Sequence, residues 1–267
     1  MANGILLYDD QSDDITFSGP SWTLPLTNMQ DPRLSKVARS SNAAVENTKF
    51  FMAYPDPITL EYFILDGTNI DEDATILVTT YTDSEFSLLD YTSEEQAAWT
   101  SSDPIFDPDA KGVPIILPLG QAVTAAYWEC DIINPTNADG YVQMGGIFHG
   151  RRLMNTYNFA PQSSFKRDPR TSIQRALAGT PYFNRHKNAR SYQLNYPNEL
   201  QDVFWDEMDK LNELSGLDRP VFVIPFPDDE ERRQRQSFRG TLSAIGDAQM
   251  LAVDLMSTGF SIEEYVG

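Results

Sequence analysis

Short stretches of β-branched and aromatic residues recur along the first half of the chain, and turn-forming residues separate them. Val, Ile, Thr, Tyr and Phe fit a pleated, half-buried surface, whereas Pro, Gly, Asn and Asp favour turns. The stretches are Gly4–Tyr8, Ile15–Gly19, Ile58–Leu65, Ala74–Thr82, Val113–Gly120, Ala125–Ile133 and Tyr141–Phe148. Regularly spaced short strands of this kind predict an antiparallel β-sandwich of the jelly-roll type.

The last third of the chain combines one helical pattern with several strand patterns. Apolar residues recur every three or four positions, which indicates an amphipathic helix; they are Leu200, Val203, Phe204, Met208, Leu211 and Leu214. Asn198 with Gln201 resembles a capping box, and Gly216 stands where a helix would end. Strand patterns flank this helix at Arg190–Tyr196, Pro220–Phe226, Ser237–Ile245 and Met250–Tyr265. The pattern predicts a small α+β domain.

Charge is distributed unevenly in a chain whose formal net charge is -19. Residues 1–155 contain 7 Lys or Arg and 23 Asp or Glu, whereas residues 156–267 contain 13 and 16. We therefore predict two domains: a β-sandwich over residues 1–155 and an α+β domain over residues 190–267. Residues 156–189 would join them as a cationic linker or arm.

Two groups of cations are candidate subunit-interface residues. The first group lies in the joining segment and comprises Lys166, Arg167, Arg170, Arg175 and Arg185. This segment is either a solvated linker or an arm that crosses onto an acidic neighbouring subunit. The second group, Arg232, Arg233 and Arg235, lies in the charged run "DDEERRQRQ". That run is either a solvated hairpin end or a charged hairpin that fixes register between subunits.

Patterns that carry catalysis or metal binding are missing from the sequence. His149 and His186 are the only histidines, and neither belongs to a zinc-binding motif. We expect His149 to be structural or solvent-facing. The run Asp66–Ala74 does not place oxygen ligands where an EF-hand needs them. Paired carboxylates could serve a glycosidase, but an acidic surface explains them better. The sequence thus predicts no enzyme, no cofactor and no metal.

The remaining composition excludes several partners. Cys130 is the only cysteine, which fits folding in a reducing cytoplasm without disulfides. The acidic balance argues against nucleic acid, because phosphate binding needs a basic face. The apolar runs are too short to span a bilayer, and the first residues show no secretory signal.

The stretch "LTNMQDPRLSKVARS" (Leu26–Ser40) opens a longer pattern. Asp31-Pro32 breaks the chain there, and its cations Arg33, Lys36 and Arg39 are expected to offset the acids Asp9, Asp10, Asp13 and Asp14. With the later run Glu61–Asp83, the stretch resembles an arrangement in virion proteins of tailed bacteriophages, where it opens a galactose-binding-like (discoidin-type) jelly roll. The positions that match are Asn28, Asp31, Pro32, Arg39, Ser40, Asn69, Ala74, Thr75 and Val78.

The C-terminal runs "RSYQLNYPNELQDVFWDEMDKLNELSG" and "PVFVIPFPDD" are similar to the closing domain of phage minor tail and tail-tip proteins. The resemblance implies a structural protein of the virion, made in the cytoplasm of the bacterial host. It would sit at the tail tip or baseplate and contact tail-tube, hub and neighbouring tip proteins as a homo-oligomeric ring or trimer. The alternative is a carbohydrate-binding module that recognises a host glycan, for which Trp22 and Trp99 are the nearest stacking residues.

Overall fold

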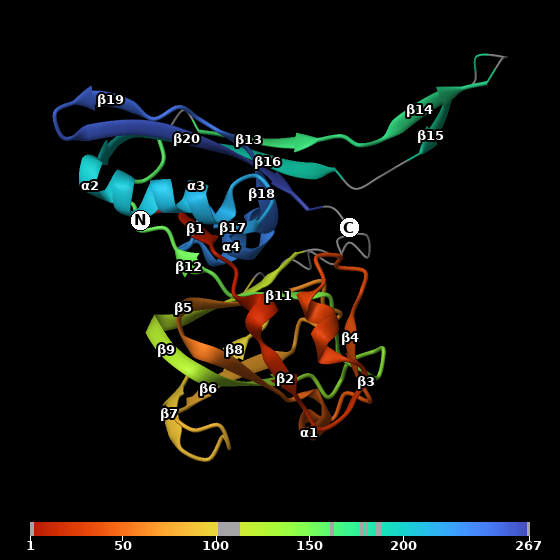
Figure 1. Ribbon diagram of the computed structural model, residues 1–267. Coiled ribbons are helices and arrows are strands. Elements are labelled where there is room, and N and C mark those ends of the chain that lie inside the picture. Colours follow the sequence, from red (N-terminus) through yellow and green to blue (C-terminus); the bar gives the residue numbers. More distant parts are fainter. Residues whose placement is uncertain are drawn as a thin grey trace. The chain divides into compact units, whose positions relative to one another are not determined.

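The computed structural model describes residues 3–100, 113–160, 163–176, 179, 181–184 and 188–265. The chain divides into two compact units, and each has its own hydrophobic core. Unit 1 comprises Met1–Asp9, Leu153–Pro227 and Phe238–Val266, and unit 2 comprises Asp10–Arg152 and Asp228–Ser237. Strands dominate both units (Figure 1), so the expected mainly β fold class is confirmed.

Unit 2 is a β-sandwich. Its larger sheet has the order β11-β5-β9-β6-β7, with β2 beside β5 and β8 beside β6, and its smaller sheet has the order β10-β4-β3. Core residues come from both sheets: Phe50, Val78 and Trp128 from the larger, and Ala38 and Met144 from the smaller. The strands are β2 (Thr16–Ser18), β3 (Trp22–Leu24), β4 (Ala38–Ser40), β5 (Phe50–Asp66), β6 (Thr75–Tyr81), β7 (Leu89–Thr92), β8 (Gln96–Ala97), β9 (Ile115–Ile133), β10 (Gln143–Met144) and β11 (Gly146–Phe148).

Two strands of unit 2 are much longer than the sequence predicts. The expected strands Val113–Gly120 and Ala125–Ile133 are one strand, β9, because Gly120 takes a positive φ of 77° and lets the chain bulge without leaving the sheet. Its partner β5 shows a register shift between Ala53 and Ile58, across "YPDP". Proline has no N–H for a sheet ladder, so it is confined to irregular positions of this kind.

The remaining elements of unit 2 are short. They are a 3-10 turn at Ser12–Asp14, a second at Leu26–Gln30, α1 (Val45–Thr48), β12 (Arg151–Arg152) and α4 (Glu230–Gln236). Across the residues that the structure describes, we find no helix that is both long enough and apolar enough to cross a membrane.

Unit 1 is a single antiparallel sheet with a helix on one face. The order is β1-β17-β18-β20-β16-β13, and β19 pairs with the free end of β20. The strands are β1 (Ile5–Tyr8), β13 (Ser164–Asp168), β16 (Ala189–Leu200), β17 (Pro220–Ile224), β18 (Phe238–Ile245), β19 (Gln249–Ala252) and β20 (Leu255–Glu264). A separate hairpin, β14 (Ser172–Arg175) with β15 (Pro181–Asn184), completes the unit.

The helix of unit 1 begins later than expected. It runs through α2 (Gln201–Val203), a π-helical turn at Phe204–Met208 and α3 (Asp209–Ser215). The capping box at Asn198 is wrong, because β16 continues to Leu200 and pairs there with β20. The predicted apolar stripe is confirmed, since Phe204, Met208 and Leu211 are buried in the core, and Gly216 ends the helix at a φ of 51°.

Two segments differ from the expected domain division. The first strand pattern, Gly4–Tyr8, is β1 and pairs with β17 of unit 1, so the chain enters the sandwich only afterwards. All four residues of β1 are buried, which suits an apolar strand covered on both faces. The segment 156–189 contains strands: β13 pairs with β16, and β14 pairs with β15.

A buried ion pair joins the first residues of β16 to the end of β20. The Glu264 carboxylate accepts hydrogen bonds from the backbone N–H of Arg190 at 2.8 Å, from its Nε at 3.0 Å and from its Nη2 at 2.6 Å. Both side chains are almost fully buried. The preceding residue, Glu263, faces solvent and pairs with Arg170 at 2.7 Å.

We predict that Glu264→Gln lowers the free energy of unfolding of unit 1 by about 3 kcal/mol, because it removes the buried carboxylate charge that faces the Arg190 guanidinium. The matched control Glu263→Gln should cost less than about 1 kcal/mol, since that pair is solvated. Urea unfolding of the two variants measures the difference. Equal losses would show that the buried pair contributes no more than the exposed one.

Candidate functional site

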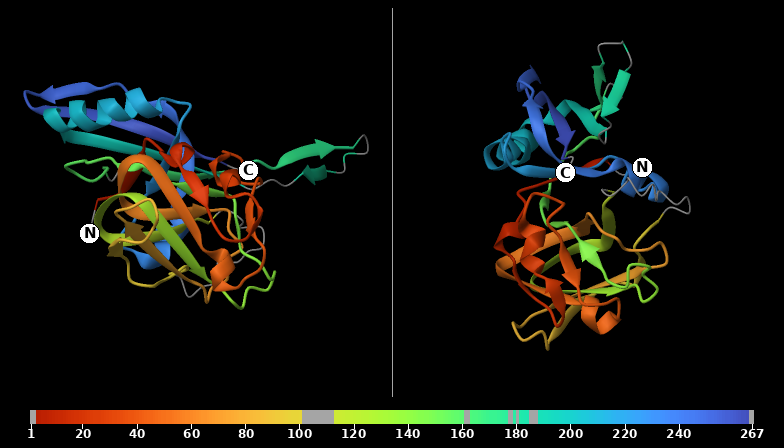
Figure 2. Two further views of the ribbon diagram at one scale, coloured as in Figure 1. Left: turned by 60° about the horizontal axis from the view of Figure 1, so that its bottom comes forward. Right: turned by 90° about the vertical axis from the view of Figure 1, so that its right-hand side faces the viewer.

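The hairpin β14–β15 of unit 1 is exposed along both of its strands. All eight residues of its two strands are exposed, and each strand pairs only with the other among the described residues. Three large apolar side chains lie on it: Ile173, Tyr182 and Phe183, which are 59%, 62% and 57% exposed. Figures 1 and 2 show the hairpin extending away from the sheet of unit 1. We call this hairpin the arm.

The cations of the first predicted group lie on the arm and on β13, which leads into it. Lys166 and Arg167 are exposed on β13, and Lys166 pairs with Asp168 on the same strand. Arg170 pairs with Glu263, and Arg175 is exposed on β14. Arg185 lies outside the described residues. The structure thus places four of the five cations in one exposed part of unit 1.

The cations of the second group lie in unit 2, on a helix and not at a hairpin end. Asp229 caps α4 by accepting a hydrogen bond from the backbone N–H of Arg232 at 2.9 Å. Arg232 and Arg235 are exposed, but Arg233 is 8% exposed. Gln234 is buried as well, and its Nε2 donates to the Ala98 carbonyl at 2.6 Å. Part of this run is therefore packed into unit 2.

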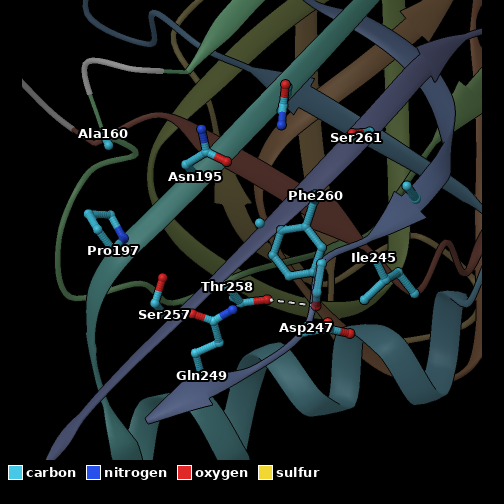
Figure 3. Close-up of a pocket in the computed structure, with 14 residues that line it drawn as sticks. Ala160, Asn195, Pro197, Ile245, Asp247, Gln249, Ser257, Thr258, Phe260 and Ser261 are labelled. Carbon is cyan, nitrogen blue, oxygen red and sulfur yellow. Dashed lines mark hydrogen bonds between the residues drawn. The ribbon is translucent and has the colours of Figure 1, made fainter. Parts of the chain in front are cut away.

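A hollow of about 480 Å³ lies on unit 1, over β16, β20 and the chain between β18 and β19 (Figure 3). Half of its lining residues are polar, and the carboxyl of Asp247 is its one ionisable group. Thr258 donates to the Gly246 carbonyl at 3.3 Å within it. The polar lining residues are Gln193, Asn195, Asp247, Gln249, Ser257, Thr258 and Ser261. Such a surface can hydrogen-bond a neutral ligand or a peptide, but it holds no acid–base pair for catalysis.

His149 is structural, one of the two roles expected for it. It is fully buried, its Nδ1 shares a hydrogen bond with the Tyr54 hydroxyl, and its ring lies 4.8 Å from that of Phe63. Its backbone N–H donates to Asp10 at 3.1 Å. Burial lowers the pKa of His149 to about 3, so the ring stays neutral in the folded protein at ordinary pH. Among the described residues no group of three or more His, Cys, Asp or Glu could hold a metal ion.

The two tryptophans considered for sugar stacking are partly buried in the core of unit 2. The indole N–H of Trp22 donates to the Lys49 carbonyl at 3.2 Å, and its ring meets Phe50 edge-on. The indole N–H of Trp99 donates to the Ile70 carbonyl at 3.0 Å. Both side chains pack against the core cluster. Their contacts explain them as packing residues.

The loop Leu26–Ser40 is held by its own side chains. Asp31 accepts hydrogen bonds from Arg33 at 2.8 Å and from Lys36 at 3.1 Å, and these hold the pKa of Asp31 below its ordinary value. The expectation that Arg33 and Lys36 offset the acids Asp9 to Asp14 is therefore wrong. Arg39 lies 4.3 Å over the ring of Tyr141 and donates to Gln143.

Asn69, another position of the sequence resemblance, fixes the loop that precedes β10. Its side-chain N–H donates to the Tyr141 carbonyl at 3.0 Å, and its side-chain oxygen accepts from the Gln143 N–H at 2.7 Å. Asn137 in turn donates to the Asn69 carbonyl at 2.9 Å. These contacts of Asn69 hold the loop before β10 in place within the sandwich.

An aromatic cluster lies on the face of the larger sheet of unit 2 that points away from the core. Phe86 takes a positive φ of 54°, which is unusual for a residue with a side chain. Its ring lies 4.7 Å from Phe51, 5.6 Å from Tyr81 and 5.9 Å from Tyr127. The Asp83 carboxylate holds this loop by accepting hydrogen bonds from the backbone N–H groups of residues 87 and 88.

Charged groups adjoin the aromatic cluster. Tyr81 donates its hydroxyl to Glu129, and Lys49 pairs with both Glu129 and Asp131. Burial raises the pKa of Asp131, and Lys49 opposes that shift.

The sequence did not predict the aromatic cluster, because its residues come from β5, β6, β9 and a loop. The arm left a stronger signal, since Ile173 and the pair Tyr182-Phe183 flank Gly179 as in a hairpin.

No family model and no curated protein matches the sequence. The solved structures that align with this chain include family 32 carbohydrate-binding modules, and the three described here each align over about half of it. One belongs to a family 31 glycoside hydrolase of Clostridium perfringens: 12% identity over 54% of this chain and 99% of that chain, with a TM-score of 0.39. A second is the NanJ module of C. perfringens in complex with galactose, with 8% identity, coverage of 54% and 97%, and a TM-score of 0.40.

A third is the module of AlyQ in complex with 4,5-unsaturated mannuronic acid. It is 16% identical over 53% of this chain and 95% of that chain, with a TM-score of 0.34. All three are carbohydrate-binding modules of family 32. None of the three is a tail protein. Identities this low say nothing of function.

We predict that the stability of unit 2 falls as the pH decreases from about 6.5 towards 3, in part because of His149. Its pKa is lower in the folded than in the unfolded chain, so protonation favours the unfolded state within this window. The slope from this group approaches about 1.4 kcal/mol per pH unit. Urea unfolding at pH 7, 6 and 5 should show the slope in the wild type. His149→Gln should lack it, and identical slopes would contradict the prediction.

Proposed function

We propose that this protein is a non-catalytic structural subunit that works through protein–protein contacts, and that a neighbouring subunit covers its arm. The single observation that supports the proposal is the complete exposure of β14 and β15 together with three large apolar side chains. An isolated two-stranded hairpin is at best marginally stable in water. Covering Ile173, Tyr182 and Phe183 would supply the burial that the arm does not obtain from its own chain.

The finer proposal is a component of the tail tip or baseplate of a tailed bacteriophage, located in the virion. It rests on the sequence resemblance alone. The partners would be tail-tube, hub and neighbouring tip proteins, together with further copies of this chain in a ring or trimer. The cations on the arm and on β13 would face acidic surfaces of these neighbours.

The assembly proposal is tested by the variant Ile173→Ser/Tyr182→Ser/Phe183→Ser. We expect the wild-type chain to form oligomers in light scattering coupled to gel filtration, and the triple variant to be monomeric with unchanged circular dichroism. The control Met250→Ser/Val253→Ser changes two equally exposed apolar residues of β19 and its turn, and it should still assemble. A wild-type chain that stays monomeric at every concentration would contradict self-assembly.

A second candidate function is carbohydrate binding by unit 2, the alternative raised from the sequence. The three modules named above bind carbohydrate in their own proteins, so this candidate is tested beside the tail-tip assignment. The observation in this chain that favours it is the aromatic cluster around Phe86, with Glu129, Asp131 and Lys49 beside it. Aromatic rings next to carboxylates and cations can stack on a sugar and hydrogen-bond its hydroxyl groups.

Carbohydrate binding can be measured by calorimetry with galactose, an N-acetylgalactosamine disaccharide and a mannuronate oligosaccharide. Phe86→Gly removes the ring but keeps a residue that accepts the positive φ, so binding should weaken about tenfold or more. The control Ser84→Ala lies in the same exposed loop and should bind normally. Absence of binding by the wild type, or equal binding by Phe86→Gly, would contradict this candidate.

A further inference from the structure

Unit 2 carries a second exposed apolar surface, at an open edge of its larger sheet. β7 is the last strand in the order β11-β5-β9-β6-β7, so one side of its backbone has no strand partner among the described residues. Leu88 and Leu89, at its start, are 62% and 63% exposed. Open edges with exposed apolar residues favour pairing with a further strand, and natural proteins protect most of them. We call residues 88–92 the β7 edge.

The β7 edge lies in the most acidic part of the chain. Residues 50–110 contain 14 Asp or Glu and no Lys or Arg. Glu85, Asp90, Glu94 and Glu95 are exposed in or near β7. The edge therefore combines apolar side chains, free backbone groups and negative charge.

The arm has the same combination with the opposite charge. Residues 163–176 contain four Lys or Arg and one Asp. The exposed apolar side chains of Ile173, Tyr182 and Phe183 lie on the same arm. Its strands also have free outer edges among the described residues, where β14 and β15 form a sheet of two strands. An exposed strand can extend the edge of another sheet, with backbone hydrogen bonds for affinity and side chains for specificity.

We propose that the arm of one copy docks on the β7 edge of a second copy of this chain. The proposal rests on the proposed function and names the surface that receives the arm. Ile173 and Phe183 lie opposite each other on one face of the arm, and Tyr182 lies on its other face. They cover Leu88 and Leu89 on the two faces of the extended sheet, while Arg175 and the cations of β13 face the acids around β7. Electrostatic complementarity selects this surface over the hollow of unit 1, whose lining carries only one charged group.

The contact is tested first by substitution on the receiving side. Leu88→Ser/Leu89→Ser should raise the dissociation constant of the oligomer about tenfold or more, because these side chains lie at the centre of the contact. Asp90→Lys/Glu94→Lys should do the same, and adding Arg175→Glu should restore part of the loss. The control Met250→Ser/Val253→Ser should assemble as the wild type does.

Engineered cysteines test the contact directly, because the only native cysteine, Cys130, is buried. Chains carrying Phe183→Cys are mixed with chains carrying Leu88→Cys under mild oxidation. We expect a disulfide-linked heterodimer on non-reducing gels. The control mixture, Phe183→Cys with Met250→Cys, should give none.

The outcomes separate this inference from the proposed function. If the arm variant abolishes oligomers while the Leu88/Leu89 variant assembles normally and no heterodimer forms, the arm docks elsewhere, so this inference fails and the assembly proposal stands. If the wild type is monomeric, both fail. A disulfide formed within one monomeric chain that carries both cysteines would likewise overturn docking between copies.

Discussion

The pairing of β16 with β20 is the interaction on which the rest of unit 1 depends. It runs in register from Ser191 opposite Glu263 to Leu200 opposite Leu255, with one irregularity after Tyr196. Alternate residues such as Leu194 and Phe260 turn into the core under the helix, and the residues between them face solvent. A slip of one residue would exchange the two faces, so the burial of the core specifies this register.

The arm depends on that pairing as well. β13 pairs with the free side of β16 and leads directly into β14. A well-packed sheet therefore anchors a hairpin that has no core of its own. In the proposed assembly, this distribution separates stability from function: the sheet and helix would contribute the free energy of folding, and the arm would keep its apolar side chains available for a partner. A protein selected only for solubility gains nothing from such an arm.

The sequence predicts elements well where alternation or helical spacing is local. The strands β1, β6, β9, β17 and β18 and the stripe Phe204, Met208 and Leu211 follow from patterns within one element. The sequence does not predict an arrangement that depends on pairing between residues far apart in the chain. β1 joins β17, more than 200 residues away, and the hollow needs β16, β20 and the β18–β19 connection together. Neither arrangement leaves a local signal.

The predicted capping box at Asn198 and the predicted hairpin end after Asp228 are wrong for a different reason. In each case the local sequence carries a signal, but strand pairing outweighs it in the first case and the signal was misread in the second. The capping pattern at Asn198 competes with strand pairing, and the ladder to β20 prevails up to Leu200. The run after Asp228 carries a helix signature: Asp229 can cap, acids fill the first turn and arginines the last turn. Reading the run as a charged hairpin end ignored this order of charges. The order of charges along a segment thus predicts its secondary structure better than the number of charges does.

The charge distribution also limits how copies of this chain can associate. The acidic surfaces of two copies of unit 2 repel each other, and so do two cationic arms. A contact between the arm of one copy and unit 2 of another is therefore favoured electrostatically. Each copy holds one arm and one β7 edge, so contacts are satisfied either by reciprocal exchange in a dimer or head-to-tail. A head-to-tail contact closes into a ring when its rotation divides a full turn, and otherwise continues as a filament. Because the complementary charges lie at the surface, added salt would weaken either proposed form, whereas the apolar part of the proposed contact would persist.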